Sequence, residues 1–412
     1  MNLLSSGTIA LVAILAVAAP AACLLMWNRL GRNRIVRIAI RVALLATCQL
    51  LAVSLAGLVL NKTYDFYTSW SELFGKPTLT TGTTSIGSHV ADGPYTAQLR
   101  AAYYAGHGTV IPWSIPGTSS GLPPLHALVY LPAAYGNPAA PDVRYPVVEL
   151  MDGVPGNPET WLGPLHLQGV LDAQIASSHA LPFIAVMPTQ NVLAPRDTQC
   201  LNVVGGPNVD TYLTADVHRA VDTGFRAASD AASWGIMGYS TGGYCALNLA
   251  MRHPDLYSSV VSLSGYARPD IGTSVGNLLG GNVALTEANS PLWEARHWRH
   301  HSLAILAIAS RHDGPSYRDT IGLDAVARPP LRISDILLAK GGHNAHLWLS
   351  LEPVAFNWLS QHLRPPLAGV SIRSDLLPVQ PPERVTKLTA GRGHRPARAL
   401  PRDVDGPAPA RS

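Results

Sequence analysis

Residues 233–254 read SWGIMGYSTGGYCALNLAMRHP. The first letters form a short apolar run typical of a buried strand, and the letters from Gly242 onward have the apolar spacing of a helix. Between them lies Gly-Tyr-Ser-Thr-Gly, which fits the G-x-S-x-G pattern of a serine nucleophile on a sharp strand-to-helix turn. We therefore expect Ser240 at the carboxyl end of a sheet strand, with its hydroxyl exposed at a helix N-terminus.

The same pattern occurs twice more, as GTSSG at 117–121 and GTSVG at 272–276. So short a motif recurs by chance in a chain with 36 glycines. Ser119 is followed almost at once by a Pro-Pro pair, which cannot open a helix so soon, and no strand precedes Ser274. Ser240 alone has strand, turn and helix in sequence, so it is the candidate nucleophile.

Short apolar runs bounded by Gly, Pro or charged residues predict seven further strands, within 108–117, 126–135, 145–153, 181–190, 258–265, 302–310 and 331–340. Helical patterns at 212–229 and 345–363 lie between or after the later runs. Strands that alternate with helices indicate an α/β protein whose mostly parallel sheet is covered by helices on both faces. We place this domain at 106–363.

A serine nucleophile needs a base, and the base needs an orienting acid. In α/β-hydrolases these follow the serine in the order acid, then histidine. Asp313 directly follows one predicted strand and His343 follows the next, so both are expected at the sheet edge that holds Ser240. Asp324 and His346 are the alternatives for the two roles.

The oxyanion of an attacked carbonyl needs preorganised N–H donors. We expect the backbone N–H groups of Thr241, directly after the nucleophile, and of Val154, in the glycine-bearing loop after an early strand. A plain tight turn is the alternative for that loop.

Three aromatic residues, Tyr239, Trp161 and Trp348, are candidates for the acyl or alcohol site, with simple core packing as the alternative. The histidines at 300, 301 and 312 have no spacing that places two ligands on one face, so we predict no metal. The proposed chemistry needs no organic cofactor.

The N-terminus carries two uncharged apolar runs, 9–27 and 42–60, each long enough to cross a roughly 30 Å hydrocarbon core as a helix. The segment between them holds five arginines and no acid: Arg29, Arg32, Arg34, Arg37 and Arg41. Positive charge favours the cytoplasmic side, so we expect residues 1–60 to form a two-helix membrane anchor and the rest to lie on the extracytoplasmic side. A cleaved signal peptide is the alternative.

The remaining segments are read from composition. Residues 61–105 are polar and turn-rich and suit a juxtamembrane linker, and the Pro- and Arg-rich residues 364–412 suit a disordered tail. An oxidising compartment would let Cys200 pair with Cys245, with two separate buried thiols as the alternative. The net charge of +4 comes from the arginine loop and the tail and does not argue for nucleic acid. The oligomeric state is not predicted.

Four stretches carry a family resemblance: LMDGVPG at 150–156, TYLTADV at 211–217, the stretch 238–269 around Ser240, and GGHNAHLW at 341–348. They resemble the esterase D-like branch of the α/β-hydrolases, which includes the mycolyltransferases of the antigen 85 complex and membrane-tethered actinobacterial esterases. The resemblance covers about 126–363. It implies an α/β-hydrolase fold and assigns the triad and oxyanion roles to the residues named above. Two features depart from the mycolyltransferases, which carry Glu as the acid and lack a two-helix anchor.

The expected function is that of an exported, membrane-anchored serine hydrolase that cleaves or transfers acyl groups of small-molecule or lipid carboxylic esters through an acyl-enzyme. Two alternatives stay open: mycolyltransferase-like transfer to envelope sugars, and a catalytically silent hydrolase-like domain that only binds a ligand.

Overall fold

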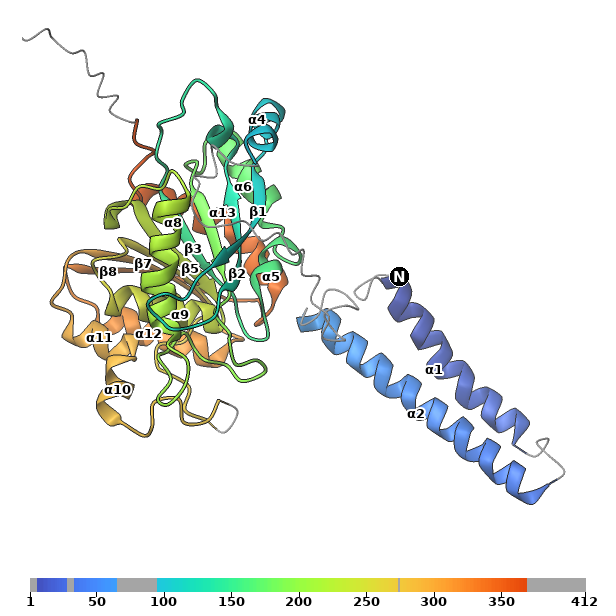
Figure 1. Ribbon diagram of the computed structural model, residues 1–412. Helices are drawn as coiled ribbons and strands as arrows, with labels where there is room; N and C mark the ends of the chain where they lie inside the picture. Colours follow the sequence, from blue (N-terminus) through green and yellow to red (C-terminus); the bar gives the residue numbers. More distant parts are fainter. Residues whose placement is uncertain (1–5, 28–32, 65–94, 273–274, 369–412) are drawn as a thin grey trace, which may run out of the picture. The chain divides into compact units, whose positions relative to one another are not determined.

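The computed structural model describes residues 6–27, 33–64, 95–272 and 275–368 (Figure 1). At the N-terminus, α1 (Ser6–Met26) and α2 (Arg34–Tyr64) form an antiparallel pair. The Arg41 guanidinium donates to the Trp27 carbonyl oxygen (2.9 Å) where the chain turns back, and the Lys62 ammonium donates to the Ser6 hydroxyl (2.8 Å) at the open end. By length and composition both helices can cross a membrane.

All eight predicted strands are present, in one sheet of order β1-β2-β4-β3-β5-β6-β7-β8. β2 runs antiparallel to both β1 and β4, and the strands from β4 to β8 pair in parallel. The bounds are β1 Thr109–Ile115, β2 Leu125–Leu131, β3 Val147–Met151, β4 Ile184–Pro188, β5 Trp234–Tyr239, β6 Ser259–Leu263, β7 Leu303–Ser310 and β8 Leu331–Leu338. The predicted fold class is confirmed.

Helices cover both faces of the sheet and bury one hydrophobic cluster on each. Along β5, Trp234 and Ile236 point to the first cluster, while Met237 and Tyr239 point to the second, as the two-residue period of a strand requires. The first face is covered by η3 (Tyr212–Val217, a π-helix), α8 (His218–Gly224), α9 (Thr241–Arg252), α11 (Pro291–His297) and α12 (Gly314–Val326). The second is covered by α5 (Pro158–Leu162), α6 (Leu167–Ala176) and α13 (Ala345–His362).

Four further helices are short: η2 Ala133–Gly136, α7 Val209–Thr211, η4 Ala231–Ser233 and α10 Val283–Ala288. α7 runs directly into η3, whereas η2, η4 and α10 lie in connections between the larger elements.

The folded domain begins earlier than the sequence predicts. Thr96–Ala105, in the expected linker, is helix α4, and it buries Leu99 and Ala102 against η2 and β1. The apolar side chains of this one turn anchor the helix to the domain. Residues 65–94 of the expected linker and 369–412 of the expected tail lie outside the described residues.

Candidate active site

Ser240 lies on a tight turn between β5 and α9, with φ 56° and ψ −126°. A positive φ is uncommon for a residue with a side chain and marks local strain. Its N–H donates to the Leu263 carbonyl oxygen at the end of β6 (2.9 Å), which holds the turn against the sheet.

The glycines on either side of Ser240 are required by close backbone contacts. A Cβ at Gly238 would collide with the backbone of Gly242, and one at Gly242 would collide with the carbonyl oxygens of Met151 and Asp152. The G-x-S-x-G pattern therefore lets the turn pack directly on the loop that follows β3.

The structure brings together Ser240, His343 and Asp313. His343 Nε2 lies 2.7 Å from Ser240 Oγ, and His343 Nδ1 lies 2.7 Å from Asp313 Oδ2. Asp313 is the N-cap residue of α12 just after β7, and His343 lies in the loop between β8 and α13. The Ser310 hydroxyl donates to the Gly341 carbonyl oxygen (2.9 Å) and ties these two loops together.

Exposure differs sharply within this trio. The His343 side chain is 40% exposed, whereas that of Asp313 is 7% exposed. A buried carboxylate that accepts from Nδ1–H leaves Nε2 as the acceptor for the serine proton, which is the arrangement a general base needs.

The alternative residues lie elsewhere. Asp324 is exposed on α12, and His346 is exposed in the first turn of α13. Ser119 lies in the exposed loop after β1, where its N–H donates to Asp216 Oδ1 (2.7 Å). Ser274 lies outside the described residues.

The two expected oxyanion donors lie on segments that meet beside Ser240. Thr241 is the first residue of α9, so its N–H has no acceptor within the helix. Val154 follows Gly153, at which an added Cβ would lie 3.0 Å from the Cβ of Ser240. Both N–H groups therefore belong to backbone next to the serine.

The three aromatic residues expected to line the substrate site are buried instead. Trp161 is 0%, Tyr239 3% and Trp348 7% exposed, and all belong to the cluster under α13. Their rings are in contact: Tyr239 stacks on Trp348 at 4.5 Å between ring centroids and meets Trp161 edge-on at 5.2 Å. The expectation is corrected: they are core residues. Alternate residues of β5, the buried face of α13 and Trp161 of α5 all point into the hydrophobic cluster between the sheet and these helices.

One of these rings supports the candidate base. Trp348 meets the His343 ring edge-on at 5.1 Å, and its indole N–H donates to the Ser264 hydroxyl (3.1 Å). Trp348, itself held by this hydrogen bond and by Tyr239, therefore limits how the His343 ring can rotate.

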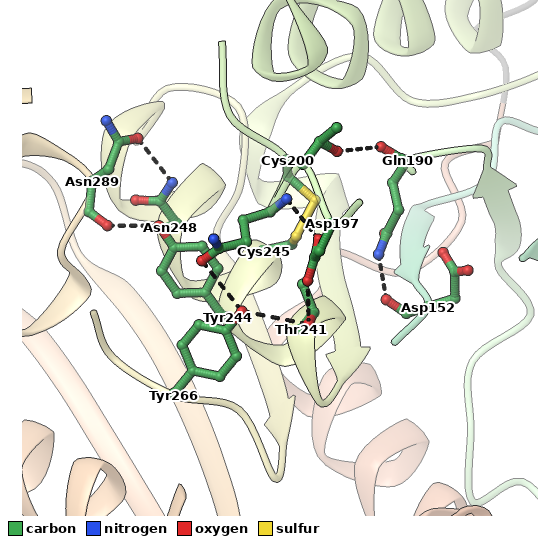
Figure 2. The surroundings of a disulfide bond; sticks show 12 residues. Asp152, Gln190, Asp197, Cys200, Thr241, Tyr244, Cys245, Asn248, Tyr266 and Asn289 are labelled. Atoms are coloured by element: carbon green, nitrogen blue, oxygen red, sulfur yellow. Dashed lines mark hydrogen bonds between the residues drawn. A yellow bond between two sulfur atoms is a disulfide. The ribbon is translucent and has the colours of Figure 1, made fainter. Parts of the chain in front are cut away.

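Residues 190–200, after β4, make a further contact to this region, of which the sequence analysis predicted only the pairing of Cys200 with Cys245 (Figure 2). The Gln190 amide donates to the Asp152 carbonyl oxygen, and the Thr241 hydroxyl donates to Asp197 Oδ2 (2.8 Å). Cys200 is joined to Cys245 of α9 by a disulfide. The available signal was position, since these residues follow a parallel strand at the same sheet edge as Ser240.

Buried carboxyl groups lie close to the expected oxyanion donors. Burial raises the pKa of Asp152 well above its ordinary value, and burial also raises the pKa of Asp197. Both shifts have the same physical cause, since burial disfavours the ionised form of a carboxyl group.

No three His, Cys, Asp or Glu side chains gather as metal ligands would within the described ranges.

Comparison with known proteins gives both a family and a fold. Residues 123–344 match the family described as "Putative esterase". An uncharacterized protein of Corynebacterium glutamicum is 27% identical over 348 residues, which cover 81% of this chain and 77% of that protein.

Three solved structures share the fold at low identity. A ferulic acid esterase has a TM-score of 0.52 at 19% identity over 62% of this chain and 100% of its own. A fluorophosphonate-binding serine hydrolase of Staphylococcus aureus has a TM-score of 0.51 at 17% identity, over 62% of this chain and 99% of its own. An S-formylglutathione hydrolase of Agrobacterium tumefaciens has a TM-score of 0.53 at 14% identity, over 63% of this chain and 97% of its own.

The family match spans more than half of the chain and includes Ser240, Asp313 and His343. The chain belongs to this esterase family of the α/β-hydrolases and is a carboxylic ester hydrolase.

Proposed function

We propose that the chain is a serine esterase in which Ser240 is the nucleophile, His343 the general base and Asp313 the acid that orients it. His343 Nε2 takes the hydroxyl proton while Ser240 Oγ attacks the ester carbonyl carbon. The N–H groups of Val154 and Thr241 donate to the oxyanion that forms. His343 then gives the proton to the departing alcohol, and an acyl-enzyme remains.

Water completes the reaction by the same groups in reverse. His343 removes a proton from a water molecule, the hydroxide attacks the acyl carbon, and Ser240 leaves with the proton. The 40% exposure of the His343 side chain supports access of water to this step.

A single observation carries the proposal. Two hydrogen bonds of 2.7 Å join three side chains that come from three separate loops at one edge of the sheet. A hydrolase-like domain that only binds a ligand would have no need of this arrangement, which speaks against the silent alternative.

A fluorophosphonate probe tests the nucleophile on the full-length chain in detergent, with the labelled peptide identified by mass spectrometry. We expect labelling at Ser240 and none in Ser240→Ala. Ser119→Ala is the matched control and should label fully, because Ser119 lies in the same sequence pattern but is hydrogen-bonded to Asp216 and Arg219, whereas His343 bonds Ser240. A folded wild-type protein that does not label would rule the proposal out.

The ester itself is best approached with a small panel. The names of the structural neighbours suggest a feruloyl ester and a formyl thioester as first substrates, and p-nitrophenyl acetate is added as a general chromogenic ester. Adding a sugar acceptor to the preferred ester distinguishes hydrolysis from acyl transfer, since transfer yields an acylated sugar in place of the free acid.

We further propose that α1 and α2 anchor the enzyme in the cell membrane with the esterase domain on the extracytoplasmic side. The supporting observations are two apolar helices, of 20 and 29 residues in their candidate spans, and the arginine-rich connection between them. The full chain should stay in the membrane pellet after alkaline carbonate extraction, and protease added to intact cells with a permeable outer envelope should cut the domain. Release into the carbonate supernatant, with a shortened N-terminus, would identify a cleaved signal instead.

A further inference from the structure

We propose that residues 190–200, called here the brace, set the relative position of the two oxyanion donors. Gln190 and Asp197 would be its positioning residues, and the Cys200–Cys245 disulfide would hold it to α9. This inference rests on the proposed function. It adds to that function a segment that touches neither the reacting atoms nor His343.

The first end of the brace holds the loop that carries Val154. Gln190 is 3% exposed, and its amide donates to the carbonyl oxygen of Asp152, two residues before Val154. The Thr198 hydroxyl donates to the Gln190 carbonyl oxygen (3.0 Å), so the two ends of the brace are bonded to each other. The loop that carries Val154 is thereby restrained at Asp152.

The second end holds Thr241. Asp197 Oδ2 accepts from the Thr241 hydroxyl (2.8 Å), and Asp197 Oδ1 accepts from the Gln199 N–H (2.7 Å). Both carboxyl oxygens are engaged inside the protein, which points to a positioning role and away from substrate binding. The Tyr266 hydroxyl also lies 3.4 Å from the Thr241 hydroxyl.

The disulfide connects the brace to α9 a second time, one helical turn after Thr241. Cys245 lies four residues after Thr241, on the same face of α9, and Cys200 lies three residues after Asp197 (Figure 2). Both cysteines are buried, at 1% and 0% exposed. The brace is therefore attached to the first two turns of α9 at two successive points.

The two donors otherwise belong to different elements, the loop after β3 and the start of α9. An oxyanion hole works only when its donors lie about 2.7–3.1 Å from where the oxyanion forms, and removing one donor costs about 10²–10³ in kcat. A loosened brace would misplace the donors without removing them. Variants that loosen the brace should therefore have a lower kcat, with little change in KM.

The test compares Gln190→Met and the pair Cys200→Ser/Cys245→Ser with the wild-type full-length chain in detergent. Fluorophosphonate labelling counts the active sites, and kcat and KM for p-nitrophenyl acetate are then expressed per labelled site. We expect kcat per site to fall roughly tenfold or more in both variants, with KM within about twofold. The midpoint of the pH profile of kcat/KM should not move, because the base and its acid are untouched.

Gln168→Met is the matched control. The Gln168 amide, on α6, also donates to a backbone carbonyl oxygen, but to that of Gly108 (2.9 Å), which precedes β1 and belongs to neither donor segment. It should retain the wild-type kcat per site.

Three outcomes separate the possibilities. Wild-type kcat per site in Gln190→Met and in the cysteine pair overturns the brace and leaves the proposed function standing. An equal fall of kcat per site in Gln168→Met also overturns it, and so does a rise in KM with kcat unchanged, since either result indicates a general loosening of the fold. Absence of labelling in the wild type overturns both proposals. Should Gln190→Met fail to fold, Gln190→Asn, which keeps the amide but shortens its reach, carries the same test.

Discussion

The imidazole of His343 is hydrogen-bonded to the hydroxyl of Ser240, with 2.7 Å between Nε2 and Oγ, although 103 residues separate the two along the chain. This contact depends on Asp313, whose carboxylate accepts from the opposite ring nitrogen and so selects the tautomer that leaves Nε2 free to accept.

Asp313→Asn should therefore lower kcat by about 10³- to 10⁴-fold, because an amide can stabilise the wrong imidazole tautomer. The fold should survive, since the Asp313 side chain bonds His343 and no other residue in the described part of the chain. Ester turnover and circular dichroism measure the two effects. Asp324→Asn, at an exposed position of α12, is the control, and equal activity of the two variants would contradict the assigned role.

Gly242→Ala should abolish activity and destabilise the domain, because the new methyl group would collide with the Met151 and Asp152 carbonyl oxygens. The turn would have to move away from the loop that carries Val154. Gly169→Ala in α6 is the matched control, since nothing lies within 4 Å of its added Cβ. That change should be neutral or stabilise by about 0.5–1 kcal/mol. Thermal unfolding and labelling of Ser240 distinguish the two, and a fully active Gly242→Ala would refute the packing argument.

Trp161→Phe should lower stability but leave KM for the ester unchanged, because the indole is 0% exposed and cannot touch a substrate. Loss of part of a buried aromatic ring costs on the order of 1–3 kcal/mol. Urea unfolding gives the stability and steady-state kinetics gives KM. A several-fold rise in KM without a change in stability would return Trp161 to the substrate site.

Glu149 makes stability depend on pH. It is 0% exposed in the middle of β3, accepts from the Tyr257 hydroxyl (2.7 Å), and burial raises its pKa from 4.5 to about 8. His218, at 3.8 Å, offers no countercharge, because burial lowers its pKa to about 3 and leaves the ring neutral.

Between pH 4.5 and about 8 the folded chain holds a proton on Glu149 that the unfolded chain has lost. The stabilising contribution is thus complete below pH 4.5 and is lost as the pH rises through about 8. Glu149→Gln stays neutral throughout, so its Tm relative to wild type should rise from pH 5 to pH 9. Exposed Glu287→Gln should show no such trend, and a flat difference for Glu149→Gln would show that the carboxyl is ionised when folded.

Much of the fold could be predicted from local pattern. The eight strands were found because buried parallel strands are short apolar runs bounded by Gly, Pro or charge, and α9 and α13 because their apolar spacing is helical. α4 was missed because one buried turn, with Leu99 and Ala102, is too weak a signal within a polar stretch. α12 was missed because its buried residues include Ser316 and Thr320, which carry no apolar signal.

The candidate triad was predictable for a related reason. Parallel strands bring their carboxyl ends to one edge, so residues just after successive strands must lie near one another, and chain order sorted their roles. The sequence by itself thus determined the fold class, the strand order along the chain, and Ser240, Asp313 and His343 as the candidates.

Only the tertiary structure decided what lies behind and beside these residues. Whether Trp161 faces substrate or core depends on how α5 packs under the sheet. The contacts of Gln190 with Asp152 and of Asp197 with Thr241 depend on the path of a loop whose sequence has no hydrophobic period. The hydrophobic pattern of a strand or helix indicates which of its own residues are buried. Contacts between elements are set by packing across the whole sheet, which no single stretch of sequence encodes.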